Sequence, residues 1–413
     1  MLIKKMFSIM ILLILSIVLT SCAGSREISE LAIVTATGID LVDGKVLLTN
    51  EVIKPNVNST KGENNGTSVL YLQHEGDTVF DAIRNATLTF DRKLLYSHNE
   101  IYIFGEELAK RGIGDYINFF LYDIEPRESA FMVVAKDAKA YEVMGINEGL
   151  SATPGKYLEL LIENHKYTSK TRSLNINEYI KYYYQRKTPV LGVVNREQKK
   201  FINHIQAEGQ SDHRDILNVE GGAVFFEDSL IGYYSGEEMI GFNFLVDEIG
   251  ESLIVFEVSD EFTNNDENYI ATKGKYTVLE IKDSKTKNDL IVEDGKINLT
   301  VDVKLRGVIG EDSKGLDFRN LNIVKATEEA CSNKVKEYIS QTMDKAQKDL
   351  KVDTFGVDTI FHSKYPEEWK EISNDWESIF PEISYNINVE TFIIRTGLLD
   401  MPTNVEKGES NAK

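Results

Sequence analysis

The chain has 413 residues, of which 42% are hydrophobic and 10% aromatic, a composition typical of globular domains. Its 66 acidic and 46 basic residues give a net charge of −20. This balance argues against nucleic-acid binding and against polybasic attachment to anionic lipid, because both need clustered Lys and Arg. The length exceeds what one hydrophobic core usually supports, so we expect several domains.

Residues 1–21 have the pattern of a bacterial lipoprotein signal peptide. Lys4 and Lys5 precede an apolar run over 6–19, which is shorter than the ~20 residues that a spanning helix needs. The run ends in LTSC, which matches the lipobox: small residues precede a cysteine whose thiol can accept a diacylglyceryl group. The alternative is an ordinary signal peptide that happens to contain a cysteine. We predict lipidation of Cys22 (diacylglyceryl and N-acyl), with the acyl chains as the membrane anchor.

An N-terminal α/β domain is predicted over residues 22–200, because strand and helix patterns alternate there. Residues 31–39 and 46–53 form a predicted hairpin around the Asp43-Gly44 turn. The further predicted elements are a strand at 69–72, a helix capped by Asp77, a strand at 94–104 interrupted at His98 and Asn99, a helix at 106–122, a buried strand at 129–135, and helices near 154–164 and 176–184.

A small middle domain is predicted at 201–250, and a larger α+β domain at 251–400. The middle domain would contain a strand–turn–strand segment, GGAVFFEDSLIGYYS, and a short helix at 237–244. In the larger domain, INLTVDVKLR alternates apolar and polar side chains, which predicts a half-buried strand. Strands at 253–258 and 276–282 can join it. The tail over 401–413 is polar, and we expect it to be flexible.

The C-terminal domain is also predicted to contain two helices and a last strand. A helix at 322–350 places Cys331 on its apolar stripe, so this cysteine is expected to be an inert core thiol without a disulfide partner. A second helix begins at Pro366 and carries Trp369 and Trp376 on one face. The segment ISYNINVETFI alternates again and predicts the last strand.

The motifs of common enzymes and metal sites are missing from the sequence. Its six histidines form no H-E-x-x-H pair, and neither a G-x-S-x-G elbow nor a phosphate-binding loop occurs. The acidic NNDEN segment lacks the spacing of a calcium loop. We therefore predict a non-enzymatic protein without a metal or cofactor.

A cluster of tyrosines and basic residues, YIKYYYQRK (179–187), is the candidate partner-contact site. Tyr179 and Tyr183 continue a helical apolar face, so Tyr182 and Tyr184 should point elsewhere. Tyrosine and arginine are enriched at protein interfaces, which suggests a partner contact by Tyr182, Tyr184 and Arg186. A membrane-surface contact and a buried helix with stray tyrosines are the alternatives.

Four segments in order resemble the C subunits of spore germinant receptors, the Ger(x)C lipoproteins. The first is C-x-x-x-R-E-I-x-x-L-A-I-V, which begins at Cys22 and is followed by Gly38-Ile39-Asp40. Many members have Trp-Asp after the cysteine, where this chain has Ala23-Gly24. The other three segments are DIEPRESAFMVVAKDAKA, EGGAVFFEDSLIGYYSGEE and KYPEEWKEISNDWESIFPEISYNINVETFIIRTG.

The pattern and the resemblance together predict an α+β / mixed α/β lipoprotein of three domains, each a β-sheet with packed helices. The resemblance implies a lipid-anchored protein of the cell membrane, on the outer face of the spore inner membrane. It would assemble with two integral membrane subunits, of A and B type, into a nutrient germinant receptor, without catalysis or cofactor. The alternative is an extracytoplasmic solute-binding lipoprotein that delivers a ligand to a membrane transporter.

Overall fold

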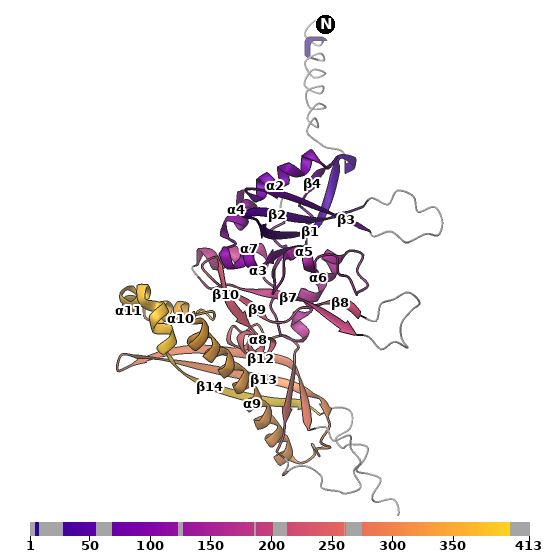
Figure 1. Cartoon of the computed structure of the whole chain (residues 1–413). Coiled ribbons are helices and arrows are strands. Elements are labelled where there is room, and N and C mark those ends of the chain that lie inside the picture. The colour runs from indigo at the N-terminus through magenta and orange to yellow at the C-terminus, as the bar shows by residue number, and fades with distance from the viewer. Residues whose placement is uncertain are drawn as a thin grey trace, which may run out of the picture.

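The computed structural model describes residues 5–7, 28–54, 68–122, 127–185, 187–200, 213–259, 261 and 275–396. Two β-sheets of mixed direction lie one after the other along the molecule, each with packed helices (Figure 1). This confirms the predicted α+β class. The predicted Cys22, Arg186 and the 401–413 tail lie outside the described residues.

In the first sheet the neighbouring strands β1, β5, β6 and β7 run parallel, β4 also pairs in parallel with β1, and antiparallel strands flank the group on both sides. Strands β5 and β6, most of β1 and the first half of β7 are buried, as expected where helices cover both faces of a sheet. Its order is β10-β9-β7-β6-β5-β1-β2-β3, while β4 pairs with β1 and β8 with β7. The strands are β1 Leu31–Val42, β2 Lys45–Ile53, β3 Val69–Gly76, β4 Lys93–Leu95, β5 Ile101–Gly105, β6 Phe131–Ala135, β7 Val190–Lys200, β8 His213–Asn218, β9 Gly222–Phe226 and β10 Ser229–Tyr234.

Helices pack on both faces of the first sheet. One face carries α2 Val79–Asn85, α3 Glu106–Arg111, α4 Gly114–Tyr122 and α7 Ile176–Tyr184, and the other carries α5 Ala140–Val143 and α6 Pro154–Glu163. Two local predictions differ from the structure. Thr78, not Asp77, caps α2, because its hydroxyl accepts from the Asp81 N–H. The helix predicted over 106–122 is split by Gly112, whose φ of 117° no regular helix can contain.

The second sheet has the order β11-β12-β13-β14 and carries a long helix, α9, on one face. Its strands are β11 Leu253–Glu257, β12 Tyr276–Glu293, β13 Lys296–Asp312 and β14 Ser384–Arg395, and its helices are α9 Leu321–Asp344, α10 Val357–Lys364, α11 Pro366–Ile372 and α12 Trp376–Ile379. The β12–β13 hairpin turns at Asp294-Gly295, where both residues have positive φ. β12 is therefore much longer than the predicted strand at 276–282.

The core of the second half confirms two side-chain predictions. Cys331 is fully buried on α9, and burial raises the pKa of its thiol to about 12. The rings of Trp369 and Trp376 meet edge to face at 5.3 Å, and Trp376 is buried. A 3₁₀ turn over Ser373–Asp375 interrupts the helix predicted between them.

Helix α8, Gly236–Leu245, joins the two halves. Its residues from Met239 to Leu245 are all buried, and it packs against α9, β10 and β12. One hydrophobic core continues from Val224 in the first sheet through Phe242 on α8 to Leu279 in the second sheet. Strands β9 and β10, which were predicted for the middle domain, pair with the first sheet, so that sheet extends past residue 200. The domain boundaries remain predictions.

Gly241 sets how closely α8 approaches α9, and this gives a stability prediction. A Cβ at Gly241 would overlap the Tyr338 carbonyl oxygen and the Thr342 hydroxyl. Alanine usually stabilises a helix relative to glycine, but this overlap should reverse the sign. We expect Gly241→Ala to lower the free energy of unfolding by about 1–3 kcal/mol.

Urea denaturation of the purified protein measures this change. Gly310→Ala is the matched control, because the nearest atom to a Cβ at Gly310 is the Val278 carbonyl oxygen at 3.9 Å. An unchanged midpoint for Gly241→Ala would contradict the close contact between the two helices.

Candidate functional site

The tyrosine cluster on α7 divides into buried and exposed members. Tyr179 is fully buried under the first sheet, whereas Tyr183 is 51% and Tyr184 72% exposed. The exposed pair meets edge to face, with ring centroids 5.9 Å apart. An exposed aromatic pair can bury a large area against a partner at little cost in side-chain entropy, which suits an interface.

Tyr182 does not belong to the exposed pair, because its side chain takes part in a cluster of polar contacts around Arg172, between α7 and α8. Its hydroxyl accepts a 2.7 Å hydrogen bond from Arg172, whose guanidinium also lies over the Tyr182 ring at 5.2 Å. Arg172 is 4% exposed, forms an ion pair with Glu248 at 2.9 Å and lies over Phe242 of α8. Tyr182 therefore helps to hold a buried cation between α7 and α8.

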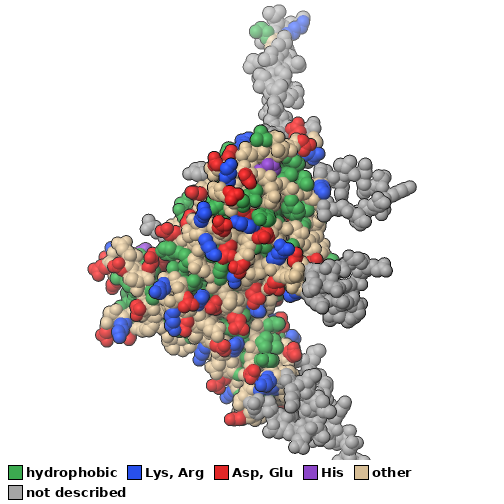
Figure 2. Space-filling model, viewed as in Figure 1, with side chains coloured by type: hydrophobic (Ala, Val, Ile, Leu, Met, Phe, Trp, Pro, Cys, Tyr) green, Lys and Arg blue, Asp and Glu red, His purple; other side chains and the backbone are tan. Residues whose placement is uncertain are grey.

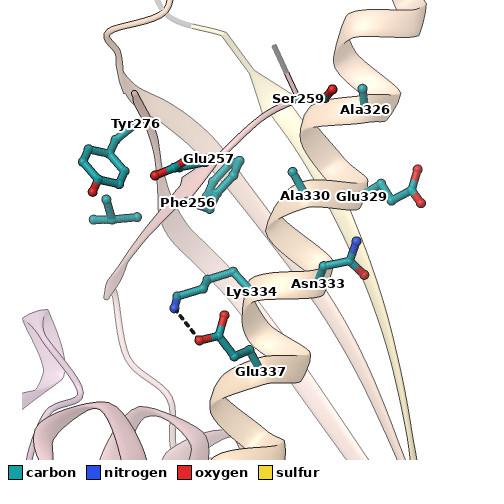
Figure 3. A pocket seen from close by; sticks show the side chains of 11 residues that line it. Phe256, Glu257, Ser259, Tyr276, Ala326, Glu329, Ala330, Asn333, Lys334 and Glu337 are labelled. Atoms are coloured by element: carbon teal, nitrogen blue, oxygen red, sulfur yellow. Dashed lines mark hydrogen bonds and ion pairs between the residues drawn. The ribbon is translucent and has the colours of Figure 1, made fainter. Parts of the chain in front are cut away.

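A groove between β11 and α9 has a volume of about 690 Å³ (Figure 3). It exists because the helix side facing the groove carries the small residues Ala326 and Ala330. Its other wall is the edge strand β11 with the exposed side chain of Val255, together with the exposed Tyr276 at the start of β12. β11 pairs only with β12 among the described strands, so its outer backbone edge borders the groove.

The groove is mainly acidic where it is charged. Glu257 extends from the strand, and Glu329 and Glu337 come from the helix. Lys334 donates to Glu337 at 3.0 Å, so its charge is compensated within the groove (Figure 3). Elsewhere, acidic and basic side chains are interspersed over the visible face of the molecule (Figure 2). This arrangement favours an extended segment with basic side chains over an anionic ligand.

Two buried carboxylates in the first sheet have structural partners. The Asp40 carboxylate accepts from the N–H groups of Ala140 and Tyr141, at 2.7 and 3.3 Å, where α5 begins. Glu51 accepts from the Gly155 N–H at 3.0 Å and from the Tyr71 hydroxyl at 2.6 Å. Both carboxylates therefore satisfy free N–H groups at helix starts.

The described residues place no three His, Cys, Asp or Glu side chains so that they could hold a metal ion. Within the same part of the chain, no helix is both long and apolar enough to cross a bilayer. The predicted lipidation site, Cys22, cannot be placed, so its role stays a prediction.

Comparisons with known proteins agree with this architecture. One family model, the spore germination protein N-terminal domain, matches residues 24–196, and a second, spore germination B3/GerAC like, C-terminal, matches residues 220–397. The chain belongs to this family of spore germination proteins.

Relatives of similar length occur in Bacillus subtilis (strain 168). Spore germination protein KC is 25% identical over 412 residues, which cover 97% of this chain and 98% of the relative. Spore germination protein A3 is 24% identical, with 92% and 96% covered. Among solved structures, the GerBC protein matches with a TM-score of 0.54 and 20% identity over 87% of this chain and 96% of that one, which shows a shared fold.

The burial of Asp40 predicts a specific pH dependence of stability. Burial raises the pKa of Asp40 to about 6, although the two N–H donors oppose the shift. The folded state then holds more protons than the unfolded state between pH 4 and 6, so stability falls as the pH rises through this range. The Asn side chain of Asp40→Asn cannot ionise. The substitution should therefore remove the part of the pH-dependent fall in the free energy of unfolding that Asp40 causes, which is on the order of 2 kcal/mol.

Urea denaturation at pH 4 and pH 7 measures this effect. At pH 4 the free energy of unfolding of the variant should be lower than that of the wild type, because the variant loses an acceptor oxygen. At pH 7 the difference between the two should be smaller, because only the wild type is destabilised by ionisation at position 40. Burial also raises the pKa of Asp353 to about 6, so part of the fall remains. Asp43→Asn, in the exposed β1–β2 turn, is the control. An equal gap between Asp40→Asn and wild type at both pH values would disprove the assignment.

Proposed function

We propose that this chain is a membrane-anchored, non-catalytic subunit of a nutrient germinant receptor, needed for receptor assembly and function in spore germination. The observation that carries the proposal is the family match, which covers residues 24–196 and 220–397 and begins two residues after the lipobox cysteine. The receptor partners would be two integral membrane subunits, of A and B type.

The proposed location is the outer face of the spore inner membrane. The lipobox supports it, because a diacylated and N-acylated Cys22 provides enough acyl chains for stable attachment. The large folded body after Cys22 is then held at one surface of the bilayer.

Two described surfaces are available for the other subunits. The first is the α7 end, with exposed Tyr183 and Tyr184, while Tyr182 keeps α7 against α8 through Arg172. We expect Arg186, two residues after Tyr184 and outside the described residues, to contribute to the same contact. The second is the groove between β11 and α9, where an extended segment could pair with the free edge of β11. Both suit contacts with protein chains better than the capture of a small nutrient, since the groove is open along a sheet edge.

The anchor is tested by the Cys22→Ala substitution in the native gene. We expect the unprocessed precursor to accumulate and the response to the nutrients of this receptor to be lost, while germination by triggers that bypass nutrient receptors persists. Mass spectrometry of the wild-type protein should show an acylated N-terminal cysteine. Ser21→Ala keeps a small residue before the cysteine and should be processed normally. Normal cleavage and full nutrient germination of Cys22→Ala would refute the anchor.

Nutrient binding separates the receptor-subunit function from the solute-binding alternative. We expect titration calorimetry of the purified protein with amino acids, sugars and nucleosides to give no heat of binding. Micromolar affinity for one of them, about −8 kcal/mol, would favour the solute-binding lipoprotein instead. The titrations are made on protein whose folding is verified by a cooperative thermal transition, so that a missing signal cannot come from unfolded material.

A further inference from the structure

The end of the molecule nearest Cys22 is defined by the start of the first sheet. Only five residues lie between Cys22 and Ile28, where the 3₁₀ turn η1 (Ile28–Glu30) leads into β1, so the two Cα atoms are six steps apart along the chain. Such a segment reaches at most about 20 Å. Leu31, the first residue of β1, pairs with Lys93 of β4, and α2 lies at the same end (Figure 1). This end of the folded body is therefore tethered close to any membrane that holds Cys22.

Apolar and basic side chains are exposed together at this end. Leu88, at the end of the turn η2 (Ala86–Leu88), is 80% exposed, and Phe80 on α2 is 46% exposed. The Arg84 guanidinium lies over the Phe80 ring at 4.9 Å. Arg92 and Lys93 lead into β4. We call Phe80, Arg84, Leu88, Arg92 and Lys93 the anchor-proximal surface.

A rigid base supports the anchor-proximal surface. Leu94 of β4 and Ala86 of η2 are buried in one cluster with Ala32 and Val34 of β1. Ile83, next to Arg84, and Phe90, two residues after Leu88, also pack on this cluster. Leu88 is thus held outward by its neighbours, and its exposure is a property of the fold.

The charge balance at this end differs from that of the whole chain. Glu30, Asp77, Asp81 and Asp91 are set against Arg84, Arg92 and Lys93, a net charge of −1, whereas the chain as a whole has a net charge of −20. An anionic bilayer repels the acidic body, and it repels this nearly balanced end least. Arg and Lys side chains can extend to headgroups while their aliphatic stems cover apolar surface.

We propose that the anchor-proximal surface rests on the lipid bilayer, with Leu88 and Phe80 in the interfacial layer and Arg84, Arg92 and Lys93 at anionic headgroups. The proposal rests on the lipid anchor proposed above and adds an orientation to it. The molecule then stands on the end that carries α2 and β4, and the second sheet with its groove extends away from the membrane (Figure 1). Acyl chains alone would leave the body free to tumble on its tether.

Site-specific fluorescence on the full lipidated chain tests this orientation. Leu88→Cys is labelled with a small fluorophore after reconstitution into vesicles of phosphatidylethanolamine and phosphatidylglycerol, some with a nitroxide near the headgroup. Leu321→Cys is the matched control, because Leu321 is 65% exposed at the start of α9 in the second half. Cys331 is buried and its thiol pKa is raised to about 12, so it should stay unlabelled.

We expect nitroxide to quench the probe at position 88 several-fold more than the probe at position 321. Equal quenching at both positions, on protein that floats with the vesicles, would overturn the orientation and leave the anchor intact. Wild-type protein that fails to float would overturn the anchor and the orientation together. Protection of position 88 only when the membrane subunits are co-reconstituted would assign this surface to a protein partner, and the lipid contact would be wrong.

Discussion

The burial of helix α8 on every side is the constraint on which the rest of the structure depends. A helix that is apolar all round must be covered all round, and here the first sheet, the second sheet and α9 cover it together. The missing side chain at Gly241 lets α9 approach closely, and Asn243 donates to the carbonyl oxygens of Ser169 and Thr171. One hydrophobic cluster consequently continues from Val190 and Val224 of the first sheet through α8 into the second sheet, while the first sheet also has clusters of its own.

Polar contacts fix the geometry of this joint. Arg172 is buried between two aromatic rings and reaches Glu248, so its charge is both paired and covered. Glu248 is half-exposed, so its loss would leave the buried guanidinium without its counter-charge, which is costly. The Ser252 hydroxyl donates a 2.5 Å hydrogen bond to the Ser169 hydroxyl. These directional bonds add orientation to the non-directional packing of α8.

The joint also separates the candidate surfaces. The first sheet carries the end nearest Cys22 and, on α7, the exposed tyrosines, while the second sheet carries the groove beside β11. A subunit that connects a membrane to protein partners needs such separate surfaces at a defined spacing. Acidic groups inside the first sheet, by contrast, serve the fold: Asp40 and Glu51 satisfy helix N–H groups, although their residue type alone would suit many functions.

The sequence by itself determined the features that depend on neighbouring residues. Asp43-Gly44 marks a hairpin turn because both residues tolerate positive φ, and the alternation from Ile297 to Leu305 marks a strand because side chains of a strand alternate between faces. The lipobox and the four family segments are also local patterns, so the family could be recognised before the structure.

Tertiary structure decided the features that depend on distant residues. Only strand pairing between distant segments shows that β9 and β10 extend the first sheet. The break between α3 and α4 is held in the same way, because the Ile113 N–H donates to the carbonyl oxygen of Asp228, which is distant in sequence. The hydrogen bond from Arg172 holds the Tyr182 side chain against the protein, whereas Tyr184 stays exposed. The groove forms because the small side chains of Ala326 and Ala330 face the edge of β11. Local pattern determines which face of an element is apolar, but only long-range packing decides what covers that face and what remains open to a partner.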